Sequence, residues 1–230
     1  MKESSKDNEI LDKLNIEAAQ GPAPAPKIAG FPAKLFGIIK FVMGACLLPF
    51  VYSFSLAFFN EFNVIERTFK GYFWAGIISF VIIYLFIYEP AIIYKKGQRL
   101  LEIIFKFFKP LVRVAPYLLP VYTIIVFILC LLLLPVFKEK EVFGYFIFLL
   151  SFSLALHLIF GAKSIRSKQG DFLKANYIFG FSFIYIIDLV LISFCLNILF
   201  KEFSFVNFFN NSCQIGSNIF YAIFKQFFFF

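Results

Sequence analysis

Five long apolar stretches run through this 230-residue chain and limit the folds it can adopt. At a rise of about 1.5 Å per residue, each is long enough, or nearly so, to cross a hydrocarbon core about 30 Å thick. Hydrophobic residues make up 61% of the sequence, whereas a soluble domain carries roughly 45–50%. We therefore expect an all-α, polytopic membrane protein with about five transmembrane helices and additional amphipathic interfacial helices. The predicted spans cover residues 34–59, 72–88, 115–137, 142–160 and 177–200.

The two ends of the chain differ from these apolar stretches. Residues 1–33 are polar, mixed in charge and interrupted by the Ala/Pro-rich run Gly21–Lys27, which is typical of a disordered tail with a stiff linker. They lack the basic start and cleavage site of a signal peptide, so we expect the first apolar stretch to remain as a span. Residues 201–230 predict an amphipathic helix in the outer interface, with a sixth span as the alternative. The polar stripe of this helix consists of Asn207, Asn211, Gln214 and Asn218.

Basic residues are concentrated in alternate gaps between the predicted spans. The flanks before span one, between spans two and three, and between spans four and five hold 16 Lys and Arg, whereas the other three flanks hold 6. The positive-inside rule then predicts a cytoplasmic N-terminus and an external C-terminal segment, in the bacterial cytoplasmic membrane. Anionic lipid of the inner leaflet accounts for the net charge of +8, so we expect membrane lipids as partners and no nucleic acid.

The gap between the second and third spans predicts a basic amphipathic helix over residues 91–109. Charged side chains recur there at steps of three and four residues, and Ile93, Gly97, Leu100, Ile104 and Phe108 share the opposite face. Such a helix lies in the membrane interface, with its apolar face in lipid and its basic side chains at the headgroups. The expected headgroup contacts are Lys95, Lys96, Arg99, Lys106 and Lys109.

Three ionisable residues fall within or beside the spans. Asp188 lies about halfway along the fifth span, where a carboxylate costs about 2.5–3.5 kcal/mol, so it needs a partner or a proton. It is either a proton or ion site or a neutral, hydrogen-bonded acid that joins helices. His157 and Arg113 lie near the cytoplasmic face and can reach the interface. His157 is expected to be several residues shallower than Asp188, which predicts no direct pair.

Three stretches resemble site-2-protease-like membrane metallopeptidases. They run from Tyr88-Glu89-Pro90 to Gly97-Gln98-Arg99-Leu100-Leu101-Glu102, from Ala115 to Thr123, and from His157 to Tyr185. In that family the histidines of a GHExxH helix hold zinc and its glutamate activates water. The corresponding positions in this chain are Gln98, Arg99 and Glu102, so all three roles are lost. The chain has a single histidine, so the resemblance implies a non-catalytic relative, without metal or cofactor, that acts as a scaffold for a membrane-protein partner.

Two other functions fit the sequence. The disordered N-terminus and five spans resemble the Yip-like membrane-organising proteins, a likeness of architecture without a specific motif. The remaining alternative is a transporter or channel subunit that uses Asp188. Transport is often associated with inverted repeats, and five spans do not divide into two halves.

Overall fold

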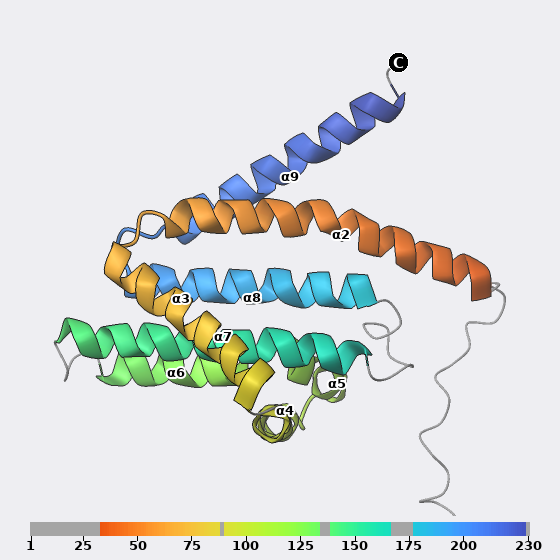
Figure 1. The fold of residues 1–230 in the computed structure, drawn as a ribbon. Helices are drawn as coiled ribbons and strands as arrows, with labels where there is room; N and C mark the ends of the chain where they lie inside the picture. The colour runs from red at the N-terminus through yellow and green to blue at the C-terminus, as the bar shows by residue number, and fades with distance from the viewer. Residues whose placement is uncertain (1–32, 88–89, 134–138, 167–176, 229–230) are drawn as a thin grey trace, which may run out of the picture. The chain divides into compact units, whose positions relative to one another are not determined.

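The computed structural model describes residues 33–87, 90–133, 139–166 and 177–228 (Figure 1). These residues form helices and no strands, which confirms the all-α prediction for this part of the chain. The chain divides into two units, residues 1–37 and 38–230. Of the first unit only residues 33–37 are described, as the start of a helix, so the predicted tail at 1–33 lies almost wholly outside the described residues.

Among the described residues, four helices are long and apolar enough to cross a membrane. They are α2 (Ala33–Phe62), α3 (Arg67–Ile82, continued by the π-helix η1, Ile83–Ile87), α7 (Lys140–Arg166) and α8 (Tyr177–Leu199). Each corresponds to one of the predicted spans, which supports an integral membrane protein with several spans. The difference from the predicted five lies in the third stretch.

That third stretch, 115–137, is not one continuous helix. Helix α5 (Lys109–Leu118) ends before Pro120, and α6 (Val121–Leu133) begins directly after it. Proline has no N–H and forces the preceding residue out of the helical region, and Leu119 is accordingly extended, with φ −104° and ψ 122°. Helix α6 has 13 residues, fewer than the about 20 that a span requires. Residues 134–137 of the predicted span lie outside the described residues.

The basic helix predicted at 91–109 is observed as α4 (Ala91–Ile104), followed by a turn that leads into α5. Tyr94, Gly97 and Leu101 form its buried face, which packs against α6 and α7. A Cβ at Gly97 would lie 2.7 Å from Val121, so the glycine permits this close approach. The predicted apolar residues Ile93, Leu100 and Ile104 are exposed on the protein surface, which is compatible with the predicted contact with lipid. The buried ridge is a further face of the helix, and the sequence did not predict it.

Small residues allow α3 and α7 to cross closely. A Cβ on Gly76 would collide with the backbone oxygen of Phe148 and with Ser151, and one on Gly144 would lie 2.5 Å from the ring of Tyr72. Close backbone approach at small residues is the usual way in which helices associate in lipid, where burial of apolar surface supplies little driving force. The crossing therefore holds α7 against α3.

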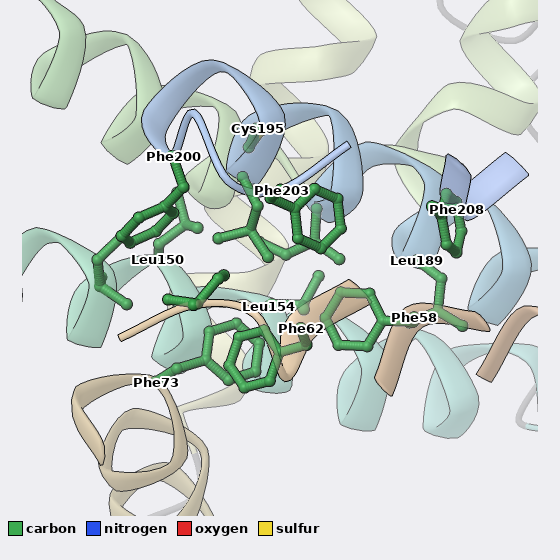
Figure 2. Close-up of a cluster of buried hydrophobic side chains, with 14 of the residues drawn as sticks. Phe58, Phe62, Phe73, Leu150, Leu154, Leu189, Cys195, Phe200, Phe203 and Phe208 are labelled. Atoms are coloured by element: carbon green, nitrogen blue, oxygen red, sulfur yellow. The ribbon is translucent and has the colours of Figure 1, made fainter. Parts of the chain in front are cut away.

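Phenylalanine side chains fill the main core, which draws on α2, α3, α7 and α8 (Figure 2). The rings of Phe62 and Phe73 are 4.8 Å apart at their centroids, a distance typical of attractive aromatic pairs. The hydroxyls of Ser55 in α2 and Tyr185 in α8 are 3.0 Å apart and form a hydrogen bond. Packing and one polar link together join α2 to α8.

The C-terminal segment forms the helix α9 (Phe205–Phe228). The Ser204 hydroxyl accepts a hydrogen bond from the backbone N–H of Asn207 at 3.2 Å, as an N-cap does. Phe208, Ser212 and Gly216 are buried on one face, and Gly216 approaches Ser53 of α2. Three members of the polar stripe are exposed and Asn211 is half-buried. The segment is helical, as expected, and its placement in the interface or across the membrane stays a prediction.

Candidate functional site

The structure brings His157 of α7 and Asp188 of α8 together. The His157 Nε2 atom lies 3.7 Å from Asp188 Oδ1, and the two side chains are only 5% and 1% exposed. The expectation that these residues would not pair is wrong. It placed the end of the fourth span at residue 160, whereas α7 continues to Arg166, which puts His157 deeper within the helix.

His157 belongs to a polar row on one face of α7. Ser153, His157 and Gly161 follow one another at steps of four residues, so they share that face. The Ser153 hydroxyl is 3.0 Å from the Thr123 hydroxyl of α6, and both groups are buried. The absence of a side chain at Gly161 leaves the Tyr94 hydroxyl 3.9 Å from where a Cβ would stand. This face of α7 therefore places the imidazole among α4, α6 and α8.

Several polar atoms of this site lack a hydrogen-bond partner. Within the described part of the chain, none is found for His157 Nε2, for either carboxylate oxygen of Asp188, or for the Tyr94 hydroxyl. The 3.7 Å between His157 and Asp188 suits an ion pair and exceeds a hydrogen-bond distance. Each unsatisfied buried polar group lowers the stability of the fold by about 1–3 kcal/mol. Their presence therefore calls for an explanation other than packing.

The break between α5 and α6 supplies backbone acceptors to the same place. His157 hydrogen-bonds to the backbone of Tyr117 in α5, and the Gln98 amide donates to the Pro116 carbonyl at 3.4 Å. The last carbonyls of a helix lack intrahelical partners and carry partial negative charge. The end of α5 therefore favours a proton or positive charge beside the pair.

Tyr94 links the pair to a cavity between α4 and α7. Its ring centroid is 6.1 Å from that of His157, and it stacks on Phe160 at 5.5 Å. Burial raises the pKa of the Tyr94 phenol above its ordinary value, so the hydroxyl keeps its proton and acts as a donor. The cavity measures about 290 Å³. Its lining consists of Ala91, Tyr94, Lys95, Gln98, Phe160, Lys163 and Ser164.

The positions that the protease resemblance singled out do not converge on a common point. Gln98 is half-buried and donates to Pro116, whereas Arg99 and Glu102 are both exposed. No group of three or more His, Cys, Asp and Glu side chains placed to hold a metal ion is found among the described residues. In the described part of the chain, the residues that the resemblance singled out therefore form no zinc site.

The basic residues expected at the lipid headgroups are exposed wherever their side chains are described. This holds for Lys95, Lys96, Arg99 and Lys106. The side chains of Lys109 and Arg113 lie outside the described part of the structure. Only Lys95 of the group also lines the cavity, which distinguishes it from its neighbour Lys96.

Sequence reasoning missed Tyr94, Tyr117 and the Thr123–Ser153 pair as parts of this site. Tyr94 precedes Gly97 by three residues and Leu101 by seven, so a helical row was visible in the sequence. Nothing in the sequence indicated that this row faces the protein. Searches of protein-family models, curated proteins and solved structures gave no match for this chain.

Proposed function

We propose that this chain is a proton-linked transporter or channel component of the bacterial cytoplasmic membrane, without enzymatic activity. Its working element is the buried His157–Asp188 pair, and the observation that carries the proposal is the geometry of that pair. An imidazole and a carboxyl face each other at 3.7 Å, almost fully buried, with their facing atoms unsatisfied by other described residues. Ionisable residues inside a membrane domain most often belong to proton or ion pathways.

The pair can hold zero, one or two protons. With one proton it is electrically neutral, as carboxylic acid with imidazole or as carboxylate with imidazolium, and this state is the least costly in a low dielectric. Gain or loss of a proton leaves a net charge between α7 and α8. Because the two groups interact, they titrate as a unit rather than as separate residues. A change of charge at this junction supplies the free energy to move one helix relative to another.

In the proposed orientation, a proton would reach the His157–Asp188 pair from the cytoplasmic side. With α5 and α6 together counted as the third crossing, the charge distribution favours a cytoplasmic position for α4 and for the end of α7 that carries Lys163. The cavity beside Tyr94 opens on that same end, next to the pair. The backbone carbonyls at the break between α5 and α6 resemble those of broken helices, which form ion sites in several transporters. A proton would thus enter from the cytoplasm along Tyr94.

Proton movement in proteoliposomes tests the proposal. Vesicles that enclose a pH-sensitive dye receive a pH step, and the wild type is compared with Asp188→Asn, which keeps the shape of the side chain and removes the titrating group. Glu202→Gln is the matched control, because Glu202 is an exposed acid outside the pair. We expect Asp188→Asn to lower the rate to that of empty vesicles and the control to keep it. Equal rates for the wild type and Asp188→Asn would contradict the proposal.

The second candidate function is that of a non-catalytic relative of the metallopeptidases, which would bind a membrane-protein partner. It is favoured by the position of α4, since the helix that carries Gly97–Glu102 packs beside the buried pair through α6 and α7. Homologues with an intact GHExxH motif aligned at these positions would support it, and a homologue set without the motif would count against it. The Yip-like alternative rests on its span layout alone, and four candidate spans are found among the described residues.

A further inference from the structure

The cavity between α4 and α7 has the lining of an anion site. Two ammonium groups, Lys95 and Lys163, stand on its two sides, one from each helix. Gln98 and Ser164 add an amide and a hydroxyl, and none of the described lining residues is acidic. Ala91, Tyr94 and Phe160 complete the lining, so the cavity combines polar and apolar side chains.

The buried Tyr94 hydroxyl is a second, independent indication that the cavity binds a ligand. Tyr94 lines the cavity, is only 6% exposed, and its hydroxyl has no hydrogen-bond partner by geometry in the described structure. Stacking on Phe160 fixes the ring, so the hydroxyl cannot turn away to water. A buried donor without an acceptor points to a ligand that brings one.

A phosphate group fits this set of donors. Its oxygens accept hydrogen bonds without offering donors in a diester, and charge-assisted bonds from lysine to phosphate are among the strong ones. Two lysines repel a cation, and a purely apolar ligand would leave the phenol unsatisfied.

We infer that the cavity formed by Tyr94, Lys95, Gln98, Lys163 and Ser164 binds a phosphate group, such as that of an anionic phospholipid headgroup. The proposed orientation puts this end of α7 at the headgroups of the cytoplasmic leaflet, where such lipids are found. The site differs from general attraction to the basic face of α4, because Lys96, Arg99 and Lys106 do not line it. It stands independently of the proton pair, since no part of it requires Asp188 to titrate.

Native mass spectrometry of the full chain in detergent tests the site. Phosphatidylglycerol is added to the wild type and to Lys95→Gln, Lys163→Gln and Tyr94→Phe, with phosphatidylcholine as the net-neutral comparison. Lys96→Gln is the matched control, because it removes the same charge one residue away and outside the cavity. We expect each lysine variant to lose about tenfold in affinity, Tyr94→Phe to lose several-fold, and Lys96→Gln to stay near the wild type.

A second arm identifies the source of the phosphate. Inorganic phosphate at millimolar concentration is titrated into the same variants. Displacement of the lipid with the same dependence on Lys95 and Lys163 would support the site and assign it to soluble phosphate, whereas no displacement would assign it to the lipid. Equal losses for Lys95→Gln and Lys96→Gln, or no binding of either probe, would overturn the inference. Tyr94→Phe keeps the aromatic ring and its stacking on Phe160, so we expect this variant to fold and to test the hydroxyl alone.

Discussion

Replacement of Asp188 by leucine separates a functional acid from a structural one. Both carboxyl oxygens of Asp188 lack a hydrogen-bond partner among the described residues, and the His157 imidazole lies 3.7 Å from one of them. Each unsatisfied buried group costs about 1–3 kcal/mol, and a neighbouring imidazole recovers part of that cost. Leucine has no polar atoms, and its larger side chain offsets part of any gain by crowding the core. Leucine at position 188 alone also leaves the His157 imidazole buried without its partner, which costs stability. We therefore expect Asp188→Leu to abolish proton movement, and the double variant Asp188→Leu with His157→Leu to raise the free energy of unfolding by about 1–3 kcal/mol.

Reversible unfolding in mixed micelles, followed by circular dichroism, measures this change. Asp188→Asn serves as the comparison, because it keeps a polar group in the same place and should not gain the same stability. Asp188→Leu alone shows how much stability is lost when the imidazole stays buried without its partner. A loss of 2 kcal/mol or more in the double variant, about the size expected when a structural hydrogen-bonded pair is removed, would refute the reasoning.

Three further predictions concern the frame and the topology. Gly76→Ala should destabilise the protein by about 1–3 kcal/mol in the same unfolding assay, because the new Cβ meets the backbone of Phe148. Gly71→Ala on the same helix should be neutral, because its Cβ would meet nothing within 4 Å. Equal effects of the two variants would show that α3 and α7 do not cross closely. A double-mutant cycle of Ser55→Ala and Tyr185→Phe should give a coupling of about 0.6 kcal/mol, as membrane hydrogen bonds do, and no coupling would show that α2 and α8 are not joined there. A protease site added at the C-terminus should be cut from outside intact cells, and cleavage from the inside only would favour either a sixth span or four spans.

Hydropathy was enough to predict the helical class and the four candidate spans found among the described residues, because the length of an apolar stretch maps directly onto the length of a helix. It did not predict where α7 ends. Lys163 and Ser164 looked like loop residues, yet the long lysine side chain can reach the headgroups while the backbone stays helical. That difference of less than two turns decided whether His157 and Asp188 could meet.

The break between α5 and α6 shows a second limit. Pro116 and Pro120 were visible in the sequence, but Pro116 is accommodated inside α5 whereas Pro120 separates the two helices. Which outcome occurs depends on neighbours that satisfy the freed backbone groups, here Gln98 and His157 at the end of α5. The candidate site depends on these tertiary contacts. Single residues such as His157 and Asp188 could therefore be picked out from the sequence, but their meeting at one place could not be predicted.

Infrared difference spectroscopy across pH tests the central claim most directly, because it detects a proton on the carboxyl without knowledge of any substrate. Full-length protein in lipid is titrated between about pH 5 and pH 8, the range in which an unperturbed histidine changes charge. The account predicts a carboxyl C=O band that changes with pH in the wild type and in Glu202→Gln, is absent in Asp188→Asn, and shifts its pH dependence in His157→Gln. Identical spectra for the wild type and Asp188→Asn would contradict it.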